Sequence, residues 1–151
     1  MPRPTRTEER ARMNLDVPLT VRELIQLLVI KLEADSMTEV IRRSINFYRE
    51  VFCELQEGTT FWLCDANGLE KKMLFTQTLK SRKEKRVRMN LDVPLAVREK
   101  IQKLAEETDV NMTKVIRRAV ETRAVFEFIP DGSHIVMIDV MKSRHKIRFC
   151  F

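Results

Sequence analysis

Residues 12–19 read RMNLDVPL, and the same eight letters return at residues 88–95, 76 positions later (88 − 12). In each copy the apolar residues Met, Leu and Val alternate with Arg, Asn and Asp. Because a β-strand points alternate side chains to opposite faces, each copy predicts a strand with one apolar and one polar face. Two such strands in one chain predict a paired, two-stranded ribbon.

The spacing of apolar residues changes from alternation to a helical period directly after each strand. Pro18 and Pro94 lack the N–H that a strand ladder needs, but proline fits the first turn of a helix. The apolar stripe that follows has steps of three and four, which predicts an amphipathic helix in each copy. Its positions are Val21, Ile25, Leu28 and Leu32, and in the second copy Val97, Ile101, Leu104 and Thr108.

A second helix is expected to open at Ser36 in the first copy and at Asn111 in the second, because both residue types are strong N-caps. Ser36 and Glu39 also have the spacing of a capping box, in which each residue bonds the backbone N–H of the other. Glycine and proline after these helices predict their ends near Gln56 and before Pro130.

A β-hairpin signal follows each pair of helices. Residues 59–64 and 70–75 flank Asn67-Gly68, whose preference for positive φ predicts a type I′ turn. Residues 131–139 align with residues 57–65, and the closing strand of this second hairpin is expected over residues 146–151. Both hairpins are too apolar to be fully exposed to solvent. They are therefore expected either to pair with each other into a small second sheet or to present a strand edge to a partner.

The repeat predicts an α+β chain of two similar units. The expected parts are a flexible arm at residues 1–9, unit one at 10–56, a hairpin at 57–75, a charged linker at 76–85, unit two at 86–128 and a second hairpin at 129–151. A unit of about 45 residues buries too little apolar surface to fold alone. The two units are therefore expected to pair, within one chain or by a swap between chains.

Composition restricts the class of protein. The chain has 151 residues, of which 44% are apolar and 33% charged, so it is globular rather than disordered. Its net charge of +6 and pI of about 9.5 are typical of proteins that bind a polyanion. No apolar run is long enough for a membrane span or a secretory signal. We expect a cytoplasmic protein associated with the nucleoid.

The residues that bind metals or form disulfides are scattered. Cys53, Cys64 and Cys150 have no CxxC spacing, and His134 and His145 lie apart from any cluster. We expect reduced, mostly buried thiols, no metal and no cofactor. A chain with three glycines and no Ser/His/Asp set has no recognisable catalytic motif, so no enzymatic activity is expected.

The order of strand, proline, amphipathic helix, capped turn and a helix opening with Val-Ile-Arg-Arg (residues 40–43 and 115–118) resembles the ribbon-helix-helix family of DNA-binding proteins. The resemblance covers residues 10 to about 55 and 86 to about 127. In that family two units pair their strands into an antiparallel ribbon that enters the major groove. The resemblance implies a single-chain pseudo-dimer that binds double-stranded DNA as a transcriptional repressor.

The same resemblance implies which strand residues contact base edges. Arg suits guanine, Asn suits adenine and Asp suits cytosine. With Asn14 opposite Asn90, each aspartate would lie across from an arginine, so the carboxylates either read bases or orient the arginines as cross-strand ion pairs. The candidates are Arg12, Asn14, Asp16, Arg88, Asn90 and Asp92. Because both strands carry identical polar letters, the target is expected to be an inverted repeat.

Phosphate contacts are expected from the N-termini of the second helices, where free N–H groups and the helix dipole favour an anion. Basic residues just before each strand are further candidates. The full set is Ser36, Met37, Thr38, Asn111, Met112, Thr113, Arg10 and Arg86.

One helix face differs between the copies and suggests another function. Leu24, Leu27 and Ile30 stand where the second copy has Lys100, Lys103 and Glu106. Either a hairpin or the linker packs on the three apolar residues, or they form an interface for self-association or a protein partner. The alternative function is an antitoxin-like or other interaction protein that binds its partner through the hairpins or through helix 19–33.

Overall fold

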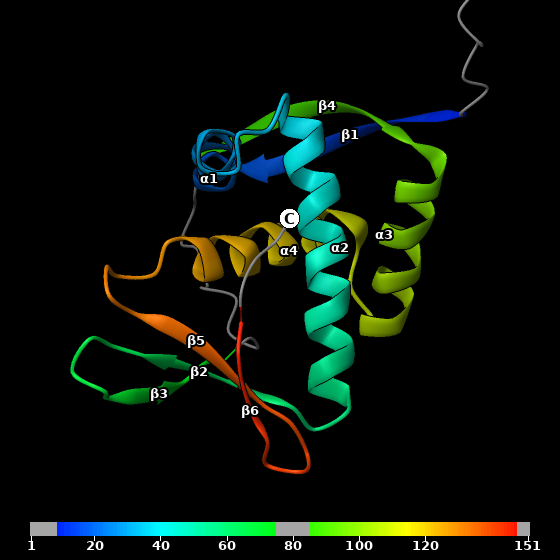
Figure 1. Cartoon of the computed structure of the whole chain (residues 1–151). Coiled ribbons are helices and arrows are strands. Elements are labelled where there is room, and N and C mark those ends of the chain that lie inside the picture. The colour runs from blue at the N-terminus through cyan, green and yellow to red at the C-terminus, as the bar shows by residue number, and fades with distance from the viewer. Residues whose placement is uncertain (1–8, 75–84, 148–151) are drawn as a thin grey trace, which may run out of the picture.

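The computed structural model describes residues 9–74 and 85–147. Residues 1–8, 75–84 and 148–151 lie outside that description, and with them most of the predicted arm and linker and the end of the last predicted strand. The described part is a mixed α+β structure of four helices and six strands in two antiparallel sheets. Figure 1 shows a two-stranded ribbon at one end, helices in the middle and a four-stranded sheet at the other end.

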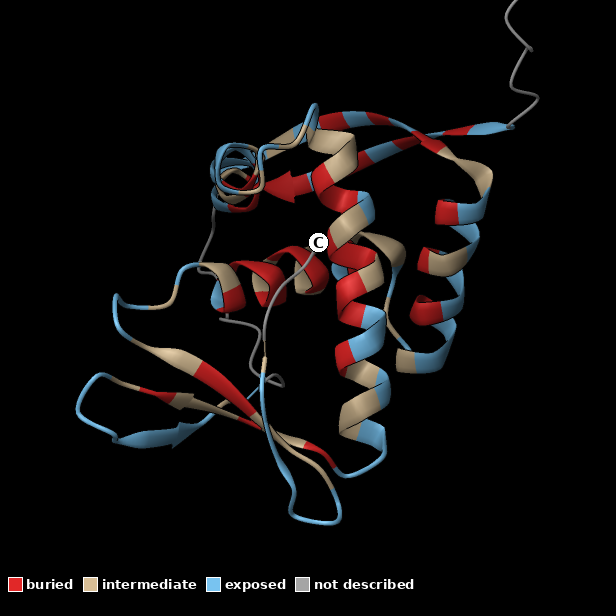
Figure 2. Ribbon diagram, in the orientation of Figure 1, coloured by how far each residue is buried: buried red, intermediate tan, exposed pale blue. Residues whose placement is uncertain are grey.

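The two copies of the octapeptide pair with each other. Strands β1 (Arg10–Pro18) and β4 (Arg86–Pro94) run antiparallel, with Asn14 opposite Asn90 at the centre. Their Met, Leu and Val side chains are buried, except for the partly buried Val87, and their polar side chains are exposed, an alternation visible along both strands in Figure 2. The predicted strands, faces and register are confirmed, and the pairing forms within one chain.

Four helices cover the apolar face of the ribbon. They are α1 (Leu19–Lys31), α2 (Met37–Gln56), α3 (Leu95–Thr108) and α4 (Met112–Glu127). Helices α2 and α4 pack on each other, and α1 and α3 both contact α4. The predicted stripes supply the core, except that Leu32 and Thr108 at the helix ends are partly exposed.

The first helix of each repeat is tied to the opposite repeat. Pro18 and Pro94 precede α1 and α3 and make no side-chain cap. The backbone N–H of Leu19 donates to the carbonyl oxygen of Lys85 at 2.8 Å, and that of Leu95 donates to the carbonyl oxygen of Glu9 at 2.8 Å. Two helix N–H groups that have no partner in their own helix are thereby satisfied across the molecule.

The hairpins join into the second sheet, which confirms the first of the two predicted arrangements. Its strands are β2 (Thr60–Cys64), β3 (Glu70–Lys72), β5 (His134–Ile138) and β6 (Arg144–Lys146), in the order β3-β2-β5-β6. The central strands β2 and β5 come from different repeats. Phe61 and Ile135 of these strands pack against Phe47 and Val51 of α2 and Phe126 of α4 in a second apolar cluster.

The predicted type I′ turn of the first hairpin is wrong. Asn67 does not adopt positive φ, so no type I′ turn forms, and residues 65–69 make a longer loop around Gly68 at φ +82°. The Asp65 carboxylate accepts from the backbone N–H groups of Asn67 and Leu69, both at 2.9 Å. The Asp139 carboxylate likewise accepts from the N–H of Ser143 at 2.9 Å. These side-chain bonds add to backbone bonds in the same loops, where the N–H of Gly68 donates to the carbonyl oxygen of Asp65 and that of Lys142 donates to the carbonyl oxygen of Asp139.

The strands beside these loops also differ from the prediction. Strand β3 ends at Lys72, short of the predicted end at residue 75. Strand β6 begins at Arg144, two residues before the predicted start, because the Asp139 loop closes early. Arg144 of β6 forms an ion pair with Glu70 of β3, the strand at the other end of the strand order.

A buried arginine lies where α2 and α4 meet. The Arg123 side chain is 1% exposed, and its Nη2 lies 2.8 Å from Oε1 of Glu127. Its guanidinium carbon lies 4.8 Å from the ring centre of Phe47. Burial lowers the pKa of Arg123, while the Glu127 carboxylate acts in the opposite direction. The equivalent position in the first repeat, 75 residues earlier (123 − 48), is Tyr48.

Candidate nucleic-acid interface

The outward face of the ribbon holds all six predicted base-contacting residues. Each of them is exposed, whereas their neighbours in both strands face the core. Arg12 and Arg88 make no hydrogen bond or ion pair to any described residue. Four side chains of the Arg and Asn types are therefore free to contact a ligand on one surface. They are Arg12, Asn14, Arg88 and Asn90.

The expected cross-strand ion pairs are absent from the described residues. The register does place Arg12 opposite Asp92 and Asp16 opposite Arg88. However, the arginines that reach across are Arg10 and Arg86, whose Nη1 atoms donate to the backbone carbonyls of Asp92 and Asp16 at 3.2 and 3.1 Å.

An exposed ion pair has little more favourable free energy than the two separately hydrated charges. This small gain is opposed by the conformational entropy lost when a long side chain is ordered. The hypothesis that Asp16 and Asp92 hold the opposite arginines as ion pairs is therefore wrong. Both carboxylates remain in water on the candidate surface.

The predicted N-caps of α2 and α4 are confirmed. Ser36 Oγ accepts from the Glu39 backbone N–H at 3.2 Å, and Asn111 Oδ1 accepts from the Lys114 N–H at 2.8 Å. The reciprocal half of the capping box is shifted by one residue, because Glu39 Oε2 accepts from the N–H of Asp35 at 2.9 Å and not from that of Ser36.

The charges at the start of α2 are partly compensated. The hydrogen bond from Asp35 lowers the pKa of Glu39, and the nearby guanidinium groups of Arg43 and Arg42 act in the same direction. Arg43 lies 3.1 Å and Arg42 3.8 Å from Glu39 Oε1, and Arg43 also donates to the carbonyl of Leu32 at 3.0 Å. Arg42 and Arg43 therefore form ion pairs within the protein, whereas Arg12 and Arg88 form none with the described residues.

The N-terminus of α2 lies beside the ribbon. A hollow of about 730 Å³ is lined by the N-cap Ser36 and Thr38 of α2 and by Arg10 and Asp92 of the two strands. A second hollow, of about 370 Å³, brings Met37 and Thr38 next to Arg88 and Asn90. Helix α4 contacts β1 as α2 contacts β4. Predicted phosphate contacts of the first repeat therefore share one surface with predicted base contacts of the second repeat.

The apolar face of α1 is partly covered. Leu24 packs against the core, whereas Leu27 is 53% and Ile30 77% exposed. The explanation that a hairpin packs on all three residues is therefore wrong for the hairpin residues that the structure describes. The predicted linker lies outside them.

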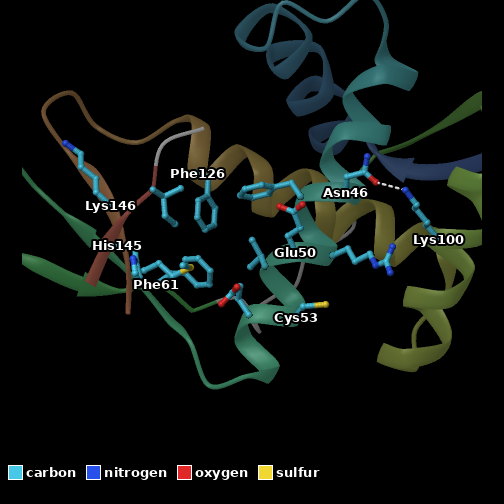
Figure 3. A pocket seen from close by; sticks show the side chains of 14 residues that line it. Asn46, Glu50, Cys53, Phe61, Lys100, Phe126, His145 and Lys146 are labelled. Atoms are coloured by element: carbon cyan, nitrogen blue, oxygen red, sulfur yellow. Dashed lines mark hydrogen bonds between the residues drawn. The ribbon is translucent and has the colours of Figure 1, made fainter. Parts of the chain in front are cut away.

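Sequence reasoning missed a groove between α2 and the second sheet (Figure 3). Its volume is about 840 Å³, and the aromatic side chains of Phe47, Phe61 and Phe126 are among those that line it. Lys100 of α3 donates to Asn46 Oδ1 at 3.2 Å at one side of it. No local pattern could reveal this groove, because its walls come from α2, α3, β5 and β6.

The expectation that the cysteine thiols are mostly buried is met only in part. Cys53 is exposed beside this groove, whereas Cys64 is buried in β2. Burial and the neighbouring Glu70 carboxylate raise the pKa of Cys64, which keeps it a protonated thiol. Cys150 lies outside the described residues.

Comparisons of the chain with protein families, curated proteins and solved structures found no match. No helix in the described part of the chain has the length and apolar character needed to cross a membrane. Within residues 9–74 and 85–147, no three His, Cys, Asp or Glu side chains gather as a metal site would require. The candidate interface therefore rests on the geometry of the ribbon and the helix N-termini beside it.

Proposed function

We propose that the chain is a sequence-specific double-stranded DNA-binding protein, a transcriptional repressor, built from two ribbon-helix-helix units as an intramolecular pseudo-dimer. The observation that carries the proposal is the outward face of β1 and β4. It presents uncommitted Arg and Asn side chains in a symmetric register around Asn14 and Asn90. The net charge of +6 favours a polyanionic partner. The proposed role is binding rather than catalysis.

In the proposed complex the ribbon lies in the major groove, which is about 12 Å wide and admits a two-stranded ribbon. Arg12 and Arg88 donate two hydrogen bonds each to guanine O6 and N7, and Asn14 and Asn90 pair with adenine N6 and N7. The ribbon is anchored by phosphates bound at the N-termini of α2 and α4. Asp16 and Asp92 accept from cytosine N4 or discriminate against acceptor groups.

The register predicts the symmetry of the target. Because the polar residues of β1 and β4 are identical and run in opposite directions, the two halves of the ribbon read the same bases on opposite strands. The preferred site is therefore an inverted repeat. The repeats differ in their caps, Ser36 and Asn111, so the two phosphate anchors are unequal.

Selection from random duplex DNA, followed by a salt titration, tests this function. The expected result is an enriched inverted repeat containing guanine and adenine at mirrored positions. The logarithm of its binding constant should fall linearly with the logarithm of the salt concentration, with a slope of about −0.9 for each neutralised phosphate. Enrichment of no sequence, together with an affinity that does not depend on salt, contradicts the proposal.

A second candidate function is supported by the exposure of Leu27 and Ile30 on α1. In this alternative the chain is an antitoxin-like protein that captures a protein partner through that helix or through the hairpins. DNA selection separates the two candidates, because capture of a partner requires no enriched DNA sequence.

A further inference from the structure

The exposed face of α1 has a symmetric arrangement of residue types around Leu27. Leu24 and Ile30 lie three residues before and after it, and Glu23 and Lys31 lie four residues before and after it. Positions three and four apart share one face of a helix. Leu27, Ile30, Glu23 and Lys31 are all exposed, and Leu24 is partly exposed at the border with the core.

We propose that α1 is a self-association surface that binds α1 of a second copy of this chain, antiparallel, about a twofold axis through Leu27. In that arrangement each residue faces the one equally far from Leu27 on the other side. Leu27 meets Leu27 of the partner subunit, Ile30 covers Leu24 of the partner subunit, and Glu23 faces Lys31 of the partner subunit. The contact of Ile30 with Leu24 and the ion pair of Glu23 with Lys31 each occur twice, and the contact between the two Leu27 side chains occurs once, on the axis.

The charges of α1 are available for this contact. Neither Glu23 nor Lys31 has an ion-pair partner among the described residues. Such an antiparallel contact is self-complementary, since the same face serves both chains and the opposite charges at its ends match. This charge complementarity is the reason to assign a second copy, rather than an unrelated protein, to the exposed face.

Helix α3 shows that the arrangement is specific to the first repeat. The equivalent positions there are Glu99, Lys100, Lys103, Glu106 and Glu107. An antiparallel pairing about Lys103 would bring Lys100 opposite Glu106, but it would also place Lys103 opposite itself and Glu99 opposite Glu107, so like charges would meet at the centre and at both ends without any apolar contact. One chain therefore carries one self-complementary face, and the assembly closes at two chains instead of growing into a filament.

The contact is small, because α1 presents three apolar side chains per chain. We therefore expect a weak, concentration-dependent dimer rather than a permanent one. The inference does not rest on DNA binding, and its test uses the full chain without DNA, so failure of one proposal leaves the other standing.

Light scattering or sedimentation over a concentration series measures the association. The mass is expected to rise from 17.9 kDa toward twice that value as the concentration increases. Ile30→Lys should weaken the association by about tenfold or more, since it removes a buried isoleucine from the contact. It should leave the melting temperature unchanged, because the side chain is 77% exposed within the chain. The matched control is Glu106→Gln, which changes the charge by the same +1 on α3 and should have no effect.

A charge reversal tests the antiparallel register. Glu23→Lys and Lys31→Glu should each weaken association several-fold, because each places like charges in contact, and the double variant should recover the original affinity. A chain that stays at 17.9 kDa at every concentration overturns the proposal and indicates that another segment covers the face. An equal effect of Ile30→Lys and Glu106→Gln, or a double reversal that does not recover, overturns it as well.

Discussion

Asn14 lies directly opposite Asn90 at the centre of the β1–β4 ribbon. The pairing is the point about which the two octapeptides run in opposite directions, so every polar residue of one strand has its counterpart at the mirrored place in the other. A symmetric polar surface is thereby formed by one polypeptide. Its two arginines and two asparagines can be altered as pairs, which makes the proposed DNA interface accessible to simple tests.

Replacement of both outward arginines should abolish the preference for the selected site. Arg12→Ala with Arg88→Ala removes two bidentate donors, each worth about 1–3 kcal/mol of discrimination. Because both side chains are exposed and make no contact to described residues, the melting temperature should not change. Binding of selected and scrambled duplexes, measured by fluorescence anisotropy, checks this.

The control for that variant removes two positive charges far from the ribbon. Arg49 on α2 and Lys72 on β3 are exposed and lie outside the candidate interface. Arg49→Ala with Lys72→Ala should retain the preference for the selected site. If the two double variants lost the preference equally, the ribbon would not be the reading element.

Two threonines separate phosphate binding from helix capping. Thr38→Ala with Thr113→Ala should lower the affinity for all duplexes by the same factor without altering the salt slope, because threonine is uncharged. Neither hydroxyl is a cap, so stability should be retained. By contrast, Ser36→Ala or Asn111→Ala removes an observed cap bond and should cost about 0.5–2 kcal/mol of folding stability, measured by urea unfolding. A sequence-dependent loss in the threonine variant would place these residues at bases.

Stability should fall at acidic pH through Glu39. Its pKa is below the usual 4.5 in the folded chain, chiefly because of the bond from the Asp35 N–H. The folded state thus binds this proton less readily than the unfolded state. The stabilising contribution is therefore complete above pH 4.5 and is lost as the pH falls through the lowered pKa. Melting temperatures of wild type and Glu39→Gln should differ at neutral pH and converge in acid; a difference independent of pH contradicts this role.

Removal of Glu127 should destabilise the chain strongly. Glu127→Ala takes away the carboxylate 2.8 Å from the Arg123 guanidinium, whose side chain is 1% exposed. Loss of one partner of a buried ion pair costs about 3–5 kcal/mol. The control on the same helix is Glu121→Ala, which removes the more exposed partner of Arg117 and should cost about 0.5 kcal/mol. The free energy of unfolding of both variants is measured by urea unfolding. A similar decrease in both would contradict the view that burial makes the Arg123–Glu127 ion pair the more important one.

The strands, helices and register follow from local sequence because short-range patterns determine them. Alternation in the octapeptide defines the two faces, and Pro18 and Pro94 mark the change to helix. Since the two copies are identical, antiparallel pairing about Asn14 and Asn90 is the arrangement in which both apolar sets face the same core.

Other features depend on contacts between distant residues, which a local pattern does not encode. The Asp65 carboxylate competes with the turn preference of Asn67-Gly68 and lengthens the loop. Arg10 donates a hydrogen bond to the backbone carbonyl of Asp92 on the opposite strand. The charges of the strands instead predict an ion pair between Arg12 and the Asp92 carboxylate. The groove above Phe47 and Phe126 is absent from any sequence pattern, since it requires both repeats to be folded together.

The Arg123 site shows what duplication within one polypeptide permits. In two identical chains every substitution occurs twice, so a buried arginine would bring a second one, with its own desolvation cost. Here Tyr48 occupies the equivalent place, and Arg123 packs beneath Phe47 once. A mutation in this chain is inherited by one half alone. Each half can therefore evolve a separate task while the strands that join them stay the same.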